Sequence, residues 1–224
     1  MKILITGASS GIGAACAQLF ATKGWEVLLA GRDASRLASV ADALPGHGHQ
    51  CLQGDVLEWA AHPTRLPEIG QLDALVWSAG ICKLAPGMML NEKPLRQTLA
   101  VNLEAPLLVT SYLYRKKILQ DGSTIIWLGS QSAHDAGEGF SMYAASKAGL
   151  AAAARVLNKE FARRRIQIHC IEPGTVDTPM TQALIELFGG LKDGHAESML
   201  SPEAVAKEIF AKTQTDNRYA VDEY

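Results

Sequence analysis

The chain has 224 residues, of which 48% are apolar and 20% charged, a balance typical of a compact globular domain rather than a disordered or fibrous chain. Its 21 Lys and Arg against 23 Asp and Glu leave a formal charge of −2, so no general attraction to nucleic acid or to an anionic membrane is expected. The apolar start reaches glycine within a few residues, too soon for a signal peptide or membrane span, and we expect a cytoplasmic protein.

Short runs rich in Val, Ile and Leu alternate with longer alanine-rich stretches, a pattern that predicts an α/β fold with a parallel sheet between two layers of helices. Strands are expected at 2–5, 26–30, 72–77, 123–128 and 166–171, with weaker candidates near 50–53 and 218–222. Helices are expected from about Ala14 to a stop at Gly24, from near Ser35, over 92–119 and 143–163, and from Pro202 to about 212 behind an N-cap at Ser201. No repeat or linker is visible, so we expect one domain over residues 1–224.

Several polar residues are expected to be structural or solvated. The run Arg163-Arg164-Arg165 ends a helix and favours its dipole, and His47 and His49 lie in a glycine-rich loop without nearby metal ligands. The cysteines form no C-x-x-C pair, so no metal site is expected, and we expect buried free thiols at Cys16, Cys51, Cys82 and Cys170.

A glycine-rich segment, Thr6-Gly7-Ala8-Ser9-Ser10-Gly11-Ile12-Gly13, stands between the first strand and the first helix. Free backbone N–H groups and the positive end of the helix dipole can bind a pyrophosphate there. Glycine would permit a positive φ, close approach of a cofactor and tight packing of the helix on the strand. Any sharp turn into a helix could also use such glycines, so the segment requires support from the rest of the chain.

Tyr143 and Lys147 lie four residues apart and therefore share one face of a helix, where an ammonium group can act on a phenol. The chain holds a second such pair, Tyr112 and Lys116. Tyr143 follows the apolar run 123–128, whereas we interpret Tyr112 and Lys116 as an aromatic and a solvated charge on a packing helix.

From Thr6 to about Ala206 the sequence resembles the classical short-chain dehydrogenase/reductase family, through its T-G-x-x-x-G-x-G turn and its Tyr-x-x-x-Lys pair. Ser130 stands 13 residues before Tyr143, the separation typical of that family, whereas Leu99 stands 13 before Tyr112. The resemblance implies a Rossmann-type doubly wound fold. It implies an oxidoreductase that transfers a hydride between a nicotinamide cofactor and a carbonyl or alcohol.

The resemblance assigns roles to four residues. Tyr143 would be the general acid or base, aided by positive charge from Lys147, which would also hold the nicotinamide ribose. Ser130 would bind the substrate oxygen, with Ser132 as the alternative serine, and Asn102 would help carry protons to the lysine. The implied cofactor-binding residues are Gly7, Ser9, Ser10, Gly11, Ile12, Gly13, Arg32, Asp55, Val56, Ala79, Gly80, Asn102, Tyr143, Lys147, Pro173, Gly174, Val176 and Thr178.

The cofactor is expected to be NADP(H), with NAD(H) possible. A relative that uses NAD carries an acid at the end of the second strand, where this chain has Gly31 followed by Arg32. The Arg32 guanidinium suits a 2′-phosphate. Asp33 is the alternative, since its carboxylate could bind the ribose if it does not cap the next helix.

Three departures from the family pattern stand out. Ser78 occupies the place of an asparagine that many members have before Ala-Gly, the lid expected near 179–200 is short, and the tail lacks a longer glycine-containing terminus. The substrate, a modest carbonyl compound, is expected to meet His134, Phe140, Met142 and Met180. The resemblance also implies a homodimer or homotetramer through the helices over 92–119 and 143–163, where Ala151-Ala152-Ala153-Ala154 would permit close approach.

The sequence therefore predicts a cytoplasmic NADP(H)-dependent reductase of ketones or aldehydes. Two other functions are considered. A non-catalytic NADP(H)-binding sensor or scaffold would not need the residue set Asn102, Ser130, Tyr143 and Lys147. An epimerase or dehydratase of the extended type would need a larger C-terminal domain than this chain provides.

Overall fold

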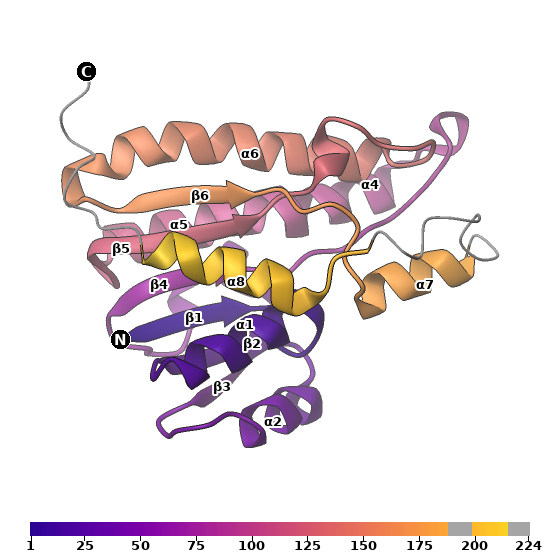
Figure 1. The fold of residues 1–224 in the computed structure, drawn as a ribbon. Helices are drawn as coiled ribbons and strands as arrows, with labels where there is room; N and C mark the ends of the chain where they lie inside the picture. Colours follow the sequence, from indigo (N-terminus) through magenta and orange to yellow (C-terminus); the bar gives the residue numbers. More distant parts are fainter. Residues whose placement is uncertain (188–198, 215–224) are drawn as a thin grey trace.

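The computed structural model describes residues 1–187 and 199–214. Six parallel strands form one sheet in the order β3-β2-β1-β4-β5-β6 (Figure 1). They are β1 (Lys2–Thr6), β2 (Glu26–Gly31), β3 (Gln50–Gln53), β4 (Leu72–Trp77), β5 (Leu119–Leu128) and β6 (Gln167–Ile171). The predicted doubly wound sheet is confirmed, and the candidate strand near 218–222 lies outside the described residues.

Helices cover both faces of the sheet, because successive side chains along a strand point to opposite sides. Ile3 and Ile5 pack under α1 (Gly11–Thr22), α2 (Ala34–Asp42) and α8 (Pro202–Thr213). Leu4 packs on the other side, in the core that α3 (Val56–Ala61), α5 (Ala105–Arg115) and α6 (Ser141–Phe161) share. The strand order reverses between β1 and β4, which opens a crevice at the carboxyl ends of these strands.

The expected helix over 92–119 is wrong as a single element. The structure has α4 (Glu92–Leu99), one π-helical turn (Ala100–Glu104) and then α5, and the segment from Leu119 already belongs to β5. Pro106 explains the interruption, because it has no N–H to donate to the carbonyl of residue 102 four positions before it. The apolar pattern runs on through both helices and does not reveal the π turn.

Arg164 is not the solvated helix end that we expected. Its side chain bonds Asp121 at 2.7 Å and donates to the carbonyls of Tyr114 and Leu119, and its guanidinium lies 4.9 Å from the centroid of the Tyr114 ring. The residue thus ties the end of α6 to the turn between α5 and β5. Arg163 and Arg165 are exposed, as predicted.

Two further expectations about side chains need correction. His49 is not simply solvated, because its Nδ1 accepts from the backbone N–H of Val27 at 3.1 Å and its Nε2 lies 3.0 Å from the Pro45 carbonyl. Of the four cysteines only Cys16 is buried, while Cys51 is exposed and Cys82 and Cys170 are partly exposed. Periodicity places the cysteine inside α1 well but says little about those in edge strands and loops.

Helix termini follow the sequence closely. Gly24 has a φ of +80° just after α1, and the hydroxyl of Ser201 accepts from the N–H of Ala204 at the start of α8. Tyr112 is partly buried in the core under α5 and Lys116 is exposed, which confirms the packing interpretation of this second Tyr-Lys pair.

Candidate active site

A cleft of about 710 Å³ opens over the carboxyl ends of all six strands. Its lining includes most of the residues that the sequence predicted: Gly7, Ser9, Ser10, Gly11, Ile12, Arg32, Asp55, Val56, Ala79, Gly80, Ser130, Tyr143, Lys147, Pro173, Gly174, Val176 and Thr178. Gly13 and Asn102 are not among the lining residues. Gly13 and Asn102 instead hold lining segments of the cleft in place, as described below.

The glycine-rich turn is built as its sequence suggests. Gly7 has a φ of +67°, which side-chain-bearing residues rarely adopt. A Cβ on Gly13 would lie 2.3 Å from the carbonyl oxygen of Gly7, so only glycine lets α1 start this close to the turn. The side chain of Ser10, the N-cap residue, makes no capping hydrogen bond, and the first N–H groups of α1 remain open to a ligand.

Arg32 and Asp33 directly follow β2 but have different surroundings. The Asp33 carboxylate accepts from the backbone N–H of Arg36 at 3.1 Å and from the Ser35 hydroxyl at 2.7 Å, and these bonds lower the pKa of Asp33. Asp33 is thus the N-cap of α2, while Arg32 and Arg36 both line the cleft. Sequence reasoning missed Arg36, although its place in the first turn of the helix that follows Arg32 was a usable signal.

Asn102 is buried in the π turn and makes three hydrogen bonds. Its Oδ1 accepts from the N–H of Ile81 at 2.9 Å, and its Nδ2 donates to the Ile81 carbonyl at 2.8 Å and to the Ser146 hydroxyl at 3.0 Å. These bonds fix the segment after β4 against α6. Asn102 therefore positions the cleft wall that includes Gly80 and Ile81.

Lys147 is only 5% exposed, and its Nζ donates to the Leu128 carbonyl at 2.6 Å. Burial disfavours the ammonium and lowers the pKa of Lys147 to about 8. The Nζ lies 5.6 Å from the centroid of the Tyr143 ring, since the two residues share one face of α6. The i, i+4 arrangement predicted from the sequence is confirmed.

Burial also governs Tyr143 and raises the pKa of its phenol to about 12, with the nearby Cys82 thiol adding to the rise and a hydrogen bond with the Ser130 side chain opposing it. Lys147 does not contribute to this shift, and the lowering that the resemblance implied for Lys147 together with the oxidised nicotinamide stays a prediction. Ser130, rather than Ser132, contacts Tyr143; the backbone N–H of Ser132 donates to the Ser130 hydroxyl at 3.1 Å.

Two of the four expected substrate contacts are wrong. Phe140 and Met180 line the cleft, but Met142 is buried in the core and His134 is exposed and pairs with Glu172 at 3.2 Å. Cys82, Gln97, Gln131 and Asp135 line the cleft instead. The positions of these side chains depend on loop conformation and on the π turn, and the periodicity of the sequence predicts neither.

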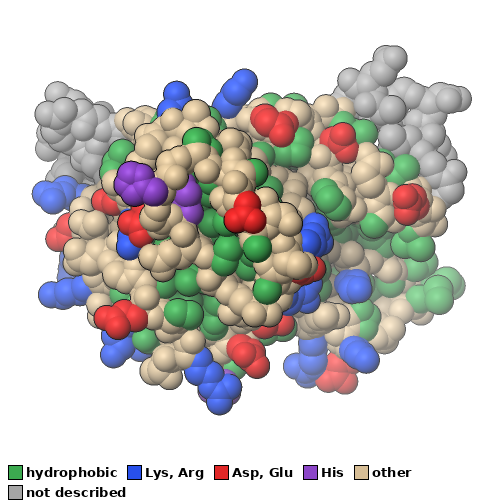
Figure 2. All heavy atoms as spheres, turned by 90° about the horizontal axis from the view of Figure 1, so that it is seen from below, with side chains coloured by type: hydrophobic (Ala, Val, Ile, Leu, Met, Phe, Trp, Pro, Cys, Tyr) green, Lys and Arg blue, Asp and Glu red, His purple; other side chains and the backbone are tan. Residues whose placement is uncertain are grey.

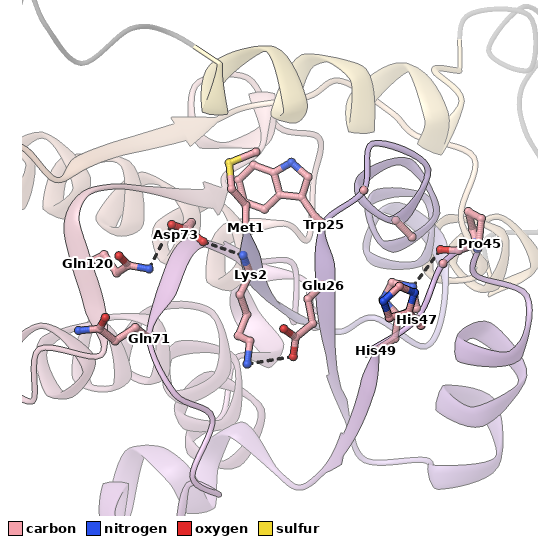
Figure 3. A pocket seen from close by; sticks show the side chains of 14 residues that line it. Met1, Lys2, Trp25, Glu26, Pro45, His47, His49, Gln71, Asp73 and Gln120 are labelled. Carbon is pink, nitrogen blue, oxygen red and sulfur yellow. Dashed lines mark hydrogen bonds and ion pairs between the residues drawn. The ribbon is translucent and has the colours of Figure 1, made fainter.

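A second hollow, of about 420 Å³, lies at the opposite, amino-terminal end of the sheet (Figure 3). Its polar groups bind one another: Lys2 pairs with Glu26 at 2.9 Å, and Asp73 accepts from the backbone N–H of Lys2 and from the side chain of Gln120. These contacts join the starts of β1, β2 and β4 to β5. The hollow is a structural junction in which the charged side chains of Lys2, Glu26 and Asp73 are already engaged.

Charge is mixed over the surface. On the face drawn in Figure 2, basic and acidic side chains are interspersed and form no broad field of one sign. Within residues 1–187 and 199–214, no group of three or more His, Cys, Asp or Glu is arranged to hold a metal ion. No helix in that part of the chain is long and apolar enough to cross a bilayer.

Comparison with known proteins places this geometry in a family. The short chain dehydrogenase family model matches residues 1–186. The chain is 34% identical to carbonyl reductase family member 4 of Xenopus tropicalis, with 81% of this chain and 78% of the relative aligned, and 33% identical to D-threitol dehydrogenase of Mycolicibacterium smegmatis, with 79% and 70% aligned. The crystal structure of BdcA in complex with NADPH superposes with a TM-score of 0.78 at 26% identity, over 95% of this chain and 86% of the other. The chain belongs to the short-chain dehydrogenase/reductase family of oxidoreductases.

Proposed function

We propose that the protein reduces a ketone or aldehyde with NADPH, reversibly, with Tyr143 as the general acid. The observation that carries this proposal is the contact between the phenol of Tyr143 and the hydroxyl of Ser130 on one wall of the cleft, with the Lys147 ammonium held close to the same ring. The named carbonyl reductase and D-threitol dehydrogenase relatives support carbonyl and alcohol chemistry.

The protonation of the site suits proton donation to a carbonyl oxygen. Because the pKa of Tyr143 is raised to about 12, the phenol keeps its proton at neutral pH and can give it to a carbonyl oxygen that accepts a hydride. Ser130 binds that oxygen and holds it within reach of Tyr143. Lys147 holds the backbone at Leu128, and Asn102 holds the facing wall at Ile81.

The cleft also fits a dinucleotide. The open N–H groups of α1, the tight packing of α1 on its turn at Gly13 and the position of Asp55 just after β3 suit such a cofactor, which would supply the hydride when bound. Arg32 and Arg36 would hold a 2′-phosphate, and Asp33 is engaged in its cap. We therefore propose NADP(H) as the preferred cofactor, in line with the NADPH bound in the BdcA structure.

We propose that the enzyme has one domain and acts in the cytoplasm. Its substrate is a small molecule, and α7 (Pro179–Leu187) forms the described part of a short lid over residues 179–200. Met180, Thr181, Leu184 and Ile185 of α7 line the cleft, so a movement of this helix would change access to Tyr143. Residues 188–198 of the proposed lid lie outside the described residues.

Tyr143→Phe tests the catalytic assignment. Loss of the phenolic proton should lower kcat/KM for NADPH-dependent reduction of a panel of ketones, aldehydes and quinones by roughly 100- to 10,000-fold, while NADPH affinity stays within about threefold. Tyr112→Phe, in the second Tyr-Lys pair, is the matched control and should keep activity. NADPH binding without turnover of any compound by the unmodified protein would favour the alternative function, a non-catalytic sensor or scaffold.

Arg32→Ala and Arg36→Ala test the cofactor preference. Each loses a cation that would face the 2′-phosphate, so the ratio of kcat/KM for NADPH over NADH should fall about tenfold or more. Arg163→Ala removes an exposed charge far from the cleft and should leave that ratio unchanged. A ratio that is unaltered in both cleft variants would contradict the assignment.

A further inference from the structure

The two ends of the cleft differ in charge. The dinucleotide end carries Arg32 and Arg36. The other end, called here the substrate half, is lined by Gln97, Ser130, Gln131, Ser132, Asp135, Phe140, Tyr143 and residues of α7. Among the lining residues of this half that the structure describes, Asp135 is the exposed charged side chain, whereas Lys147, beside Tyr143, is buried. The exposed charge of the substrate half is therefore negative, whereas that of the dinucleotide end is positive.

Two other charged groups of the cleft, Lys147 and Asp55, are already engaged. Lys147 is buried and donates to the Leu128 carbonyl, and Asp55 accepts from the backbone N–H of Leu57 at the start of α3. The carboxylate of Asp135 is exposed and has no hydrogen bond or ion pair with another residue of the described part of the chain. It is thus available to a ligand.

Backbone hydrogen bonds fix the position of residue 135 in the loop. The N–H of Asp135 donates to the carbonyl of Gln131 at 3.0 Å, and the N–H of Gln131 donates to that of Pro173 at 3.0 Å. The turn that begins at Ser130 is therefore held on both sides, and Asp135 keeps a set position relative to the hydroxyl that binds the reacting oxygen. Gln131 packs against Gly174, where an added Cβ would lie 3.1 Å from its Oε1.

Neighbouring charges do not cancel Asp135. His134 and Glu172 form a pair with each other, 3.2 Å apart. Lys83 stands on the loop where the N–H of Ala85 donates to the Gly139 carbonyl, but Lys83 is not a lining residue and no ion pair in the described part of the chain joins it to Asp135.

We propose that Asp135 makes the site select its substrate by charge. Carbonyl compounds that carry an ammonium group are preferred, neutral hydroxylated ones follow, and carboxylates are disfavoured. The physical basis is the Coulomb interaction of the charged substrate group with one carboxylate in a partly exposed cleft. Relative to a neutral substrate, this interaction should raise kcat/KM a few-fold for an ammonium compound and lower it a few-fold for a carboxylate. Phe140 and the apolar side chains of α7 supply contacts that do not depend on charge. This inference rests on the proposed function, because it places the substrate carbonyl at Ser130 and Tyr143.

The test uses three ketones of one carbon skeleton that end in an ammonium, a hydroxyl or a carboxylate group. With NADPH, kcat/KM should fall in that order and span roughly tenfold or more at low salt, with a smaller span at high salt. Asp135→Asn should reduce the span to under about threefold. Glu138→Gln, which removes an exposed charge of the same loop outside the cleft lining, should preserve it. Equal or reversed values in the unmodified protein, or a full span in Asp135→Asn, would overturn the proposal.

Binding of the same compounds separates the two hypotheses. If no ketone is reduced, the proposed function fails. Calorimetric titration of the protein in the presence of NADPH with the three ketones then still tests whether affinity falls from ammonium to hydroxyl to carboxylate. The same order in affinity, lost in Asp135→Asn, would support charge selection without catalysis. Equal affinities would overturn the inference as well.

Discussion

Burial moves the two titratable groups of α6 in opposite directions. The pKa of Tyr143 rises to about 12 and that of Lys147 falls to about 8, because burial in the same wall of the cleft deprives the charged form of each side chain of hydration. The ordinary order of the two pKa values, with tyrosine slightly below lysine, is thereby reversed, which favours a neutral pair. In the cofactor-free protein the phenol retains its proton over the whole range in which the lysine titrates, which suits a proton donor.

This depressed lysine pKa predicts how stability depends on pH. Between about pH 8 and 10 the folded protein has lost the Lys147 proton, whereas an unfolded lysine still binds one, so the Lys147 contribution to stability rises with pH over that window. The free energy of unfolding of the natural protein minus that of Lys147→Met should therefore increase from pH 8 to pH 10. Urea unfolding at fixed ionic strength measures it.

Two features make that measurement specific. Tyr143, whose folded pKa is raised, contributes stability that is lost only above about pH 10, and it is present in both proteins, so it cancels in the difference. Lys116→Met removes an exposed lysine and should give a difference that does not change with pH. A difference for Lys147→Met that stays flat or falls would contradict the burial argument.

Residue spacing predicted the positions of the proposed catalytic residues better than those of the expected substrate contacts. Ser130, Tyr143 and Lys147 lie on a strand end and one helix face, where spacing determines position, and all three line the cleft. His134 was expected there and is not, while Asp135, its neighbour, is. Side chains of the irregular segment after Ser130 point where its turn directs them, and no sequence period encodes that turn.

At the scale of elements, the π turn between α4 and α5 places Asn102. It brings the Asn102 amide to the backbone of Ile81 and to Ser146, so three elements meet at one buried side chain. A continuous helix through 92–115 would shift every later side chain around the helix axis relative to α6. The segment after β4, the π turn and α6 therefore depend on Asn102 for their relative placement.

Asn102→Leu should therefore destabilise the protein much more than Ser146→Ala. The leucine leaves the backbone N–H and carbonyl of Ile81 without partners in a partly buried site, at a cost of about 2–4 kcal/mol. Ser146→Ala removes only one of the three bonds and should cost about 1 kcal/mol. Denaturant unfolding of both variants checks the difference. Equal losses would mean that Asn102 acts only through Ser146.

Arg164 has a comparable role at the other end of α6. Arg164→Met should lower the free energy of unfolding by about 1–2 kcal/mol, since it removes bonds to Asp121 and to two backbone carbonyls and the contact with the Tyr114 ring. In a chain of this length such a loss corresponds to a decrease in Tm of roughly 2–8 °C. Arg163→Met is the matched control, because Arg163 is exposed, and its Tm should change by less than about 1 °C.

For the whole molecule, the order of apolar runs was sufficient to predict the architecture. Strands buried on both faces read as continuous Val, Ile and Leu runs, and helices between them force a parallel sheet, so five of the six strands could be placed within a few residues. The start of β5 was placed too late, at 123, because Gln120, Asp121 and Gly122 interrupt its apolar pattern. Contacts that join distant segments, such as those of Arg164 and His49, carry no local signal.

Assembly is the remaining property of the whole molecule. The expected close approach through Ala151-Ala152-Ala153-Ala154 needs revision, because Ala151 and Ala154 pack into the core of their own chain. Larger apolar side chains remain exposed on this helical layer. The exposed fraction is 36% for Leu95 on α4, 49% for Leu108 on α5 and 56% for Val156 on α6. These residues are the surfaces through which a homodimer or homotetramer can bury apolar area.

We expect a symmetric dimer through the α4 and α5 surface and, if a tetramer forms, a second interface around Val156. Leu108→Glu should then yield monomers or reduce a tetramer to dimers, and Val156→Glu should reduce a tetramer to dimers, because a buried unpaired carboxylate opposes each contact. Sedimentation velocity at micromolar concentration measures the species. Met88→Glu is the control, since Met88 is 93% exposed on the loop before α4, and it should leave the sedimentation coefficient unchanged. A natural protein that sediments as a monomer would show that the exposed leucines serve no contact between copies of this chain.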